Sequence, residues 1–242
     1  MLKIKKSSDR GYNKISWLES YHSFSFANYF NPKEMNFSHL RVINEDKIAP
    51  RSGFGFHPHK DMEIITFMIA GQIEHKDNMG NVGILKAGNA QLMRAGTGVV
   101  HSEMNNFDSQ AHLLQIWINS EEINLKPGWW EKQFTDKTIG AEVIVEPIHK
   151  SSQINKLNPA IQSKGLQMAR NGYIVKISKD TQLDFSKFGQ SEVYFHQATG
   201  QSNLVADYLS VVLNAGDAAM GDVSNLINIK TQDILLVFIF PL

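Results

Sequence analysis

From Leu40 to Ile118 the chain alternates short apolar runs with polar turn signals. The runs are rich in Val, Ile, Phe and Trp, and the turns include residues 77–81 (DNMGN), 87–89 (AGN) and 95–98 (AGTG). β-Branched and aromatic residues between glycine-containing turns are typical of strands. Short strands at this spacing predict an all-β barrel or sandwich.

The residue pattern changes across residues 119–140, where charged and turn-forming residues replace the strand-like alternation. Alternating patterns resume afterwards, so the second half of the chain is also expected to be β. We therefore place a domain junction in this segment. The expected domains are residues 1–130, an N-terminal metal-binding domain, and residues 131–242, a C-terminal domain of similar type without a metal site.

Helix is expected only around residues 152–157 and near Trp129. The C-terminal domain is expected to be built from strands, because its apolar runs are short and are separated by polar turns. These strands are predicted at Glu142–Val145, Tyr173–Ile177, Ser191–Phe195, Tyr208–Leu213 and Asp233–Phe240.

Charge and composition narrow the function classes. The chain has 24 basic and 24 acidic side chains, and this zero net charge argues against direct contact with nucleic acid. The longest apolar stretch, residues 234–240, is much shorter than the roughly 20 residues of a membrane-spanning helix. The polar N-terminus does not resemble a secretory signal, so a cytoplasmic location is expected. There is no cysteine, which leaves imidazole and carboxylate as metal ligands.

Two short motifs carry candidate metal ligands. His57 and His59 are two residues apart, and so are His101 and Glu103. Residues at this spacing on an extended strand point to the same face and can reach one ion. Pro58 favours extended backbone at His57 and suits a strand end. Three imidazoles and one carboxylate suit one divalent transition metal ion, such as Fe, Mn, Co, Ni, Cu or Zn.

The carboxylate ligand has two candidates. Glu63 lies four residues after His59 and would share its face in a regular strand, but Lys60 and Asp61 make that regularity doubtful. We therefore assign Glu103 as the ligand and expect Glu63 to hydrogen-bond a ligand histidine. Five other histidines are expected to be ordinary structural side chains: His22, His39, His112, His149 and His196. His75 is an intermediate case, because it is expected in a strand next to the site.

The sequence around these motifs resembles the pirin family. Residues 53–66 (GFGFHPHKDMEIIT) and 93–103 (MRAGTGVVHSE) are similar to the two cupin motifs as pirins have them. Residues 22–26 (HSFSF) and 40–46 (LRVINED) are similar to the opening segments of pirins. Arg94 stands where the wider cupin pattern often has proline, and that departure is itself pirin-like. Motifs that resemble the family occur throughout the first half of the chain. The second half resembles it only in its general strand-like pattern.

The resemblance implies a bicupin, with two jelly-roll β-barrel domains and metal only in the first. It also implies that His57, His59, His101 and Glu103 bind the metal, commonly iron. Several bacterial pirin-like proteins act as quercetin 2,3-dioxygenases, which implies a flavonol-like substrate, O2, and Glu103 as general base. Other pirins are thought to be metal-binding regulators or sensors that dock on a protein partner, and this alternative stays open. Phe56, Phe67, Met93, Met104 and Trp117 are candidate walls of the site or ordinary core.

Overall fold

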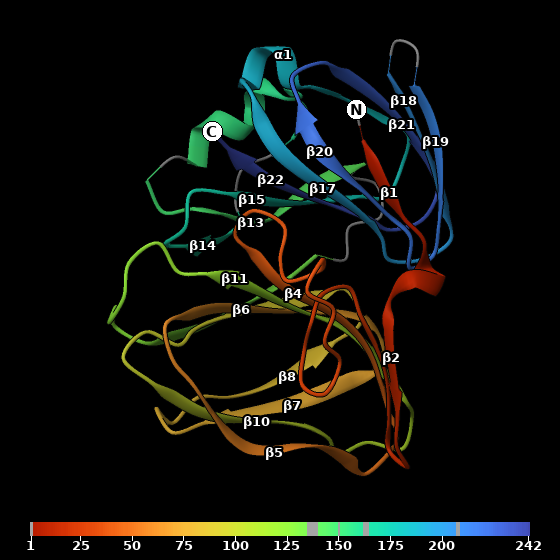
Figure 1. Ribbon diagram of the computed structural model, residues 1–242. Helices are drawn as coiled ribbons and strands as arrows, with labels where there is room; N and C mark the ends of the chain where they lie inside the picture. Colours follow the sequence, from red (N-terminus) through yellow and green to blue (C-terminus); the bar gives the residue numbers. More distant parts are fainter. Residues whose placement is uncertain (1, 135–139, 150, 162–164, 207–208) are drawn as a thin grey trace. The chain divides into compact units, whose positions relative to one another are not determined.

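The computed structural model describes residues 2–134, 140–149, 151–161, 165–206 and 209–242, and these residues are almost entirely β (Figure 1). Helical structure there is limited to α1 (Phe185–Phe188) and the 3-10 turns η1 (Ser7–Asp9) and η2 (Ser151–Lys156). The predicted all-β class is therefore confirmed. No helix among the described residues has the length and apolarity needed to cross a membrane.

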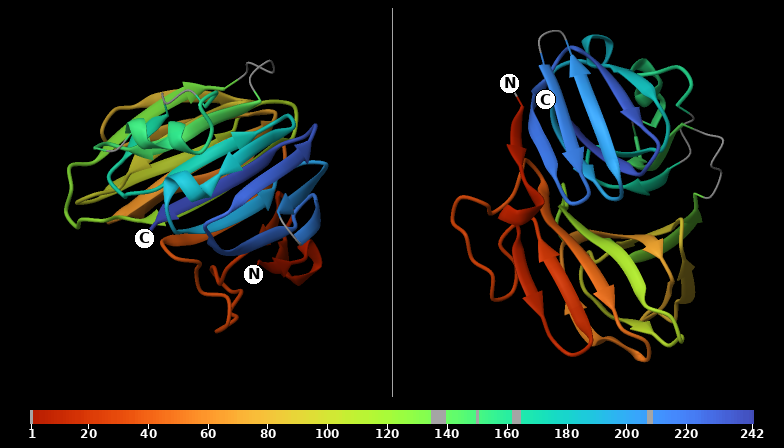
Figure 2. Two further views of the ribbon diagram at one scale, coloured as in Figure 1. Left: turned by 90° about the horizontal axis from the view of Figure 1, so that it is seen from above. Right: turned by 90° about the vertical axis from the view of Figure 1, so that its right-hand side faces the viewer.

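The chain forms two compact units. One comprises Arg10–Thr135, and the other comprises Met1–Asp9 together with Asp136–Leu242. The first residues belong to the second unit because β1 (Lys3–Lys5) pairs antiparallel with β20 (Ala218–Val223), as the red and blue strands in Figure 2 show. The expected division into residues 1–130 and 131–242 stays a prediction.

The unit of residues 10–135 consists of two antiparallel sheets, which lie in Figure 1 around a common interior. The seven-stranded sheet has the order β12 (Gly128–Gln133), β9 (Asn89–Arg94), β6 (Met62–Ala70), β11 (Ala111–Asn119), β4 (Leu40–Ile48), β3 (Leu18–His22) and β2 (Gly11–Lys14). The four-stranded sheet has the order β5 (Ser52–His59), β10 (Val99–Asn105), β7 (Gln72–Asp77) and β8 (Val82–Lys86).

The other unit repeats this two-sheet plan. Its larger sheet has the order β1, β20, β17 (Ser191–Gln197), β22 (Leu235–Pro241), β15 (Tyr173–Ile177), β13 (Ala141–Pro147) and β14 (Leu166–Met168). Its smaller sheet has the order β16 (Thr181–Asp184), β21 (Leu226–Thr231), β18 (Gln201–Ala206) and β19 (Leu209–Asn214). Two such sandwiches confirm the bicupin architecture.

Two local expectations need correction. Trp129 lies in strand β12, not in a helix, and pairs with Met93 of β9. The reason is tertiary: the indole packs against buried apolar residues that include Ile64 and Met93, which a short local sequence pattern does not reveal. Residues 151–156 are helical as expected, but of the 3-10 type. Tyr208, expected in a strand, lies outside the described residues.

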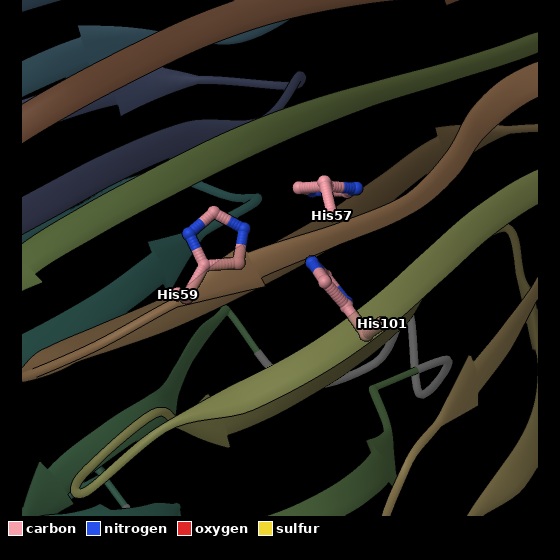
Figure 3. Close-up of side chains that lie close together, drawn as sticks. All are labelled: His57, His59 and His101. Atoms are coloured by element: carbon pink, nitrogen blue, oxygen red, sulfur yellow. The ribbon is translucent and has the colours of Figure 1, made fainter.

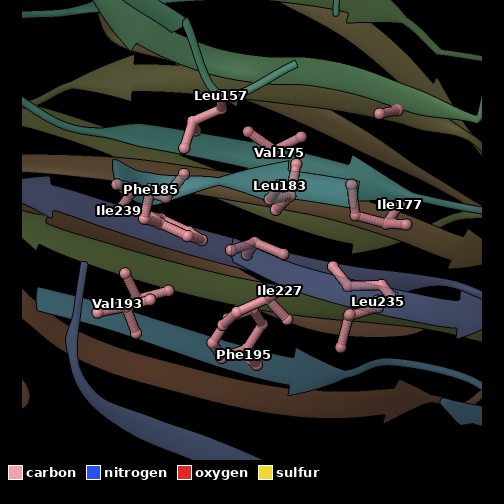
Figure 4. Close-up of a cluster of buried hydrophobic side chains, with 14 of the residues drawn as sticks. Leu157, Val175, Ile177, Leu183, Phe185, Val193, Phe195, Ile227, Leu235 and Ile239 are labelled. Atoms are coloured by element: carbon pink, nitrogen blue, oxygen red, sulfur yellow. The ribbon is translucent and has the colours of Figure 1, made fainter. Parts of the chain in front are cut away.

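Both units bury apolar as well as polar side chains. A continuous apolar cluster fills the C-terminal unit, and Figure 4 shows part of it, including Phe185, Phe195 and Leu235. The unit of residues 10–135 contains buried polar side chains that hydrogen-bond one another, such as Gln91 and Glu103. Buried polar groups need partners, and the hydrogen-bonded group around the Glu103 carboxylate is therefore a place to look for a site.

Candidate metal centre

Three neighbouring strands bring the candidate ligands together. In the sheet order β5, β10, β7, His101 of β10 lies opposite His57 of β5 on one side and opposite Asp77 of β7 on the other. Glu103 lies opposite His75 of β7. Directly opposite residues in a sheet have Cβ atoms only about 4.5–5.5 Å apart. Pairs that are distant in sequence therefore meet on one face.

A bulge sets the position of the β5 histidines. His101 pairs with His57 and Glu103 with Phe54, so two steps along β10 oppose three steps along β5. The extra residue in β5 changes which side chains face the neighbouring strand, as bulges near functional sites often do. After His59 the chain turns at Asp61, which has a φ of 49°. Glu63 therefore lies on a separate strand, β6, as the irregularity at residues 60–61 suggested.

The three histidines form one cluster. Their rings converge from β5 and β10 (Figure 3), and one nitrogen of each lies within 4.8 Å of the others. The centroids are 4.5 Å apart for His57 and His101, 4.8 Å for His57 and His59, and 5.0 Å for His59 and His101. This spacing allows all three imidazoles to bind a single ion.

The protonation state of the rings fits metal binding. Burial and the neighbouring imidazoles lower the pKa of His59 to about 4 and that of His101 to about 3, so both are neutral at neutral pH. His57 Nδ1 lies 2.7 Å from the carbonyl oxygen of Gly55, which can only accept, so Nδ1 is the donor, and in the neutral form of the ring the lone pair is on Nε2. His101 Nε2 is buried without a hydrogen-bond partner. Neutral imidazoles with free nitrogens are the donor set a divalent transition metal requires.

Glu103 is held by three neutral donors. Its Oε1 accepts from Thr66 Oγ1 at 2.8 Å and from Gln91 Nε2 at 2.7 Å, and its Oε2 accepts from Gln115 Nε2 at 2.6 Å. Trp129 Nε1 donates to Gln91 Oε1 at 2.8 Å, which orients that amide so that its nitrogen faces Glu103. The carboxylate therefore has a fixed position and one unused acceptor site, on Oε2.

Glu103 joins the histidines through a second, overlapping group. Ligand atoms of His75, His101 and Glu103 lie within 4.8 Å of one another. His101 thus belongs both to this group and to the cluster with His57 and His59. The four-residue ligand set of three histidines and Glu103 stays a prediction.

The alternative carboxylate has another partner. Glu63 Oε1 accepts a hydrogen bond from Arg94 Nε at 2.9 Å, and its side chain is fully buried. The expected hydrogen bond in which Glu63 accepts from a ligand histidine stays a prediction. Two histidines expected to be structural are hydrogen-bonded away from the cluster: His22 to Asn44 at 2.8 Å and His112 to Glu45 at 2.9 Å.

Aromatic side chains flank the cluster. The Trp117 ring lies edge-on to His59 with centroids 4.9 Å apart, and Phe26 packs against Trp117 at 5.4 Å. Trp117 Nε1 is buried without a hydrogen-bond partner, so an indole N–H donor is available beside His59. Phe56 is 68% exposed and is not core, whereas Phe67 and Met93, two further candidates for the wall, are fully buried, and Met104 is half-buried.

Several residues of the site were not singled out from the sequence. Asp77 stands two residues after His75, the same spacing as in the two ligand motifs, and that repetition was the available signal. Thr66, Gln91 and Gln115 are polar residues that each stand between two apolar neighbours in a strand. A polar residue inside such a run indicates a buried hydrogen-bond network, but not its partner.

Comparison with known proteins agrees with this geometry. The family model described as Pirin matches residues 4–118. The crystal structure of YhhW from Escherichia coli superposes with a TM-score of 0.84 at 32% sequence identity, covering 100% of this chain and 98% of that one. The chain belongs to the pirin family. A second structure, described as bacterial pirin YhhW in complex with nickel(II), matches with a TM-score of 0.83 at the same identity and covers 100% of this chain and 99% of that one.

The family-model match of this pirin includes the three clustered histidines, and sequence relatives match part of the chain. It is 47% identical over 148 residues to a protein of Escherichia coli K12 named quercetin 2,3-dioxygenase, and 48% identical over 118 residues to a pirin-like protein of Caulobacter vibrioides. These alignments cover 61% and 49% of this chain, and 64% and 51% of the two relatives, respectively. The chain therefore matches less than two thirds of the length of either relative.

Proposed function

We propose that this pirin is a metal-dependent dioxygenase of the quercetin 2,3-dioxygenase type, which opens a flavonol ring with O2. The observation that carries the proposal is the convergence of three imidazoles, those of His57, His59 and His101, whose candidate ligand atoms lie within 4.8 Å of one another. The name of the Escherichia coli relative, 47% identical over 148 residues, supports the choice of reaction. The activity of the whole chain, its substrate and any protein partner are likewise proposals.

The metal would be held by the three histidines together with Glu103. Imidazole and carboxylate ligands suit several divalent ions, and we propose iron, with Mn, Co, Ni, Cu and Zn as alternatives. When bound, such an ion acts as a Lewis acid toward the 3-hydroxyl of a flavonol and lowers its pKa.

Glu103 is the proposed proton acceptor. Two donors occupy Oε1 and one occupies Oε2, so a single acceptor site remains on Oε2. That site can serve the metal or the proton of the substrate hydroxyl, but not both at the same moment. Because Thr66, Gln91 and Gln115 hold the carboxylate in place, it can receive the proton without reorganising its surroundings.

The aromatic side chains beside His59 suit a flat aromatic substrate. Trp117 and Phe26 provide an apolar surface, and Trp117 Nε1 is an unpaired donor that a substrate oxygen can accept from. Apolar walls also exclude water from a reactive intermediate.

The test is reconstitution of metal-free protein with Fe(II), Mn(II), Co(II), Ni(II), Cu(II) or Zn(II) separately. Loss of quercetin absorbance and release of carbon monoxide in air are followed for each ion. We expect metal-dependent turnover that disappears, together with metal content, in His59→Ala. His149→Ala, an exposed histidine of the other unit, serves as the control and should retain both.

Two results would contradict the proposal in different ways. Stoichiometric metal binding without turnover by any ion would leave the metal site intact and remove the dioxygenase assignment, favouring the regulatory alternative. Full metal content in His59→Ala would show that the ligand set is wrong.

A further inference from the structure

A row of three side chains leads from the three-histidine cluster into the neighbouring strand. His101 Nδ1 lies 3.4 Å from His75 Nδ1, and His75 Nε2 lies 3.2 Å from Asp77 Oδ2. The side chains of His75 and Asp77 are completely buried. His101 thus has a buried histidine and a buried carboxylate behind it, on the side away from its free Nε2.

The hydrogen bonds of Asp77 determine which groups donate. Oδ1 accepts from the backbone N–H of Met79 at 2.9 Å and of Asn81 at 3.0 Å, and Oδ2 accepts from Asn81 Nδ2 at 2.8 Å. A carboxylate that accepts at both oxygens leaves His75 Nε2 as the donor in their contact.

The same reasoning extends to His101. A neutral His75 protonated at Nε2 carries a lone pair on Nδ1, and that lone pair faces His101 Nδ1. His101 Nδ1 must then be the protonated donor, and its Nε2 carries a lone pair. This is the buried Nε2 that has no partner in the described structure.

The row is held rigidly. The imidazole of His75 stacks on Trp129 with centroids 5.1 Å apart and planes 12° from parallel. The turn after Asp77 is tied to β10 next to His101, because Asn78 N donates to the carbonyl of Val100 at 2.9 Å and Val100 N donates to Asn78 Oδ1 at 3.1 Å. Neither His75 nor Asp77 can turn away without breaking these contacts.

We propose that His75 and Asp77 are positioning residues that hold His101 in the Nδ1-protonated tautomer, so that Nε2 is always ready to bind metal. The inference deepens the proposed function and rests on its metal site. His57 achieves the same state through the carbonyl of Gly55. Partners that orient a metal-binding histidine in this way typically change metal affinity 10–100-fold when they are replaced.

The decisive variant is Asp77→Asn, because it should reverse the donor and acceptor roles along the row of Asp77, His75 and His101. The two backbone N–H groups hold the amide oxygen at the Oδ1 position, so the amide nitrogen takes the Oδ2 position and faces His75 Nε2. His75 must then accept at Nε2 and donate from Nδ1, which forces His101 to accept at Nδ1 and carry its proton on Nε2. Asn81 can rotate its own amide to accept from the new donor.

Two readouts follow the variant. The first is the tautomer of His101 in metal-free protein, measured by long-range proton–nitrogen NMR on histidine labelled with nitrogen-15. The second is Ni(II) affinity, measured by competition with a chelator. His75→Phe keeps an aromatic ring against Trp129 and removes the acceptor for His101. Asp217→Asn, a buried carboxylate that accepts from backbone Ser7 in the other unit, is the matched control.

We expect Nδ1-protonated His101 in the parent protein, Nε2-protonated His101 in Asp77→Asn, and 10–100-fold weaker Ni(II) binding in Asp77→Asn and His75→Phe but not in Asp217→Asn. An Nε2-protonated His101 in the parent protein would overturn the inference, even if the variants failed to fold. So would an unchanged tautomer and affinity in Asp77→Asn. If the parent protein bound no metal, the proposed function would fail, and the tautomer measurement would still decide the positioning role.

Discussion

The indole of Trp129 stacks on the imidazole of His75 and at the same time donates its N–H to Gln91 Oε1 at 2.8 Å. His75 contacts His101, and Gln91 donates to Glu103. One residue of β12 therefore supports both kinds of proposed ligand, the imidazole and the carboxylate. Strand β12 pairs with β9, in the other sheet from His101 and Glu103, so Trp129 also links the two sheets of this unit.

Trp129→Phe separates the two functions of the indole. The phenyl ring keeps a stacking surface for His75, but Gln91 Oε1 loses its donor, and a buried acceptor left unpaired costs about 1–3 kcal/mol. Urea unfolding should show a loss of that order. Trp130→Phe, at the neighbouring position that is 42% exposed, should change stability by less than about 0.5 kcal/mol. Equal effects of the two substitutions would show that the Gln91 hydrogen bond is not stabilising.

Gly53→Ala and Gly55→Ala test the close approach of β5 to β10. A Cβ at Gly53 would lie 2.4 Å from the carbonyl oxygen of Glu103 and 2.7 Å from the Cα of Met104, whereas a Cβ at Gly55 meets nothing within 4 Å. Because backbone cannot rotate away as a side chain can, Gly53→Ala must push β5 and its histidines from β10.

We expect Gly53→Ala to lower stability by about 1–3 kcal/mol and to weaken metal binding. Gly55→Ala, two residues away on the same strand, should leave both near the parent values. Chelator competition and urea unfolding on the same samples check this. Parent-like metal affinity in a folded Gly53→Ala protein would contradict the importance of the β5–β10 register.

Glu103→Gln tests the proposed proton acceptor. The amide keeps the shape of the carboxylate, and Gln115 can rotate its own amide to accept from it, so we expect the histidines to retain metal. Loss of the base should lower turnover by about 10²–10⁴-fold. Metal content is measured by elemental analysis and turnover by quercetin absorbance. Glu74→Gln, on β7 beside His75, is the control, and unchanged turnover in Glu103→Gln would remove the base assignment.

The lowered pKa of Asp217 predicts an acid-sensitive contact in the C-terminal unit. Burial acts to raise its pKa, but hydrogen bonds from the backbone N–H of Ser7, from Lys6 Nζ and from the backbone N–H of Asn214 outweigh burial and lower the pKa below its ordinary value. A depressed carboxylate pKa stabilises the fold above the unfolded value, about 3.9, and this stabilisation is lost as pH falls through the folded value.

The parent protein should therefore lose stability between about pH 5 and pH 2 more steeply than Asp217→Asn, which has no charge to titrate there. Urea midpoints measured across this range check the difference. Parallel pH profiles would show that Asp217 is not perturbed in the folded protein. At neutral pH the substitution should cost about 1–3 kcal/mol, since hydrogen bonds to a charged group are replaced by weaker ones.

Much of the β architecture was predictable from local pattern. The strand at Tyr173–Ile177 has the expected bounds, and the strand at 141–147 extends the expected one by one residue at its start and two at its end. These segments are runs of β-branched residues between turns, so local preference and tertiary environment agree. The segment around Trp129 was misassigned because its strand depends on pairing with β9 and on packing against Met93.

The sequence by itself identified the three histidines that cluster in the structure. Residues two apart on a strand share a face whatever lies around them, so the pair at His57 and His59 and the motif at His101 carried their geometry in their spacing. The second half has only two widely spaced histidines, His149 and His196, so a C-terminal domain without a metal site stays a prediction from the sequence.

Only the tertiary structure decided what surrounds those ligands. Strand order placed β7 beside β10, which brought His75 and Asp77 behind His101, and the bulge in β5 shifted His57 into register with His101. The donors to Glu103 come from β6, β9 and β11. Spacing along one strand is a local property of the backbone, whereas which strands become neighbours, and in which register, depends on how the whole barrel buries its apolar faces.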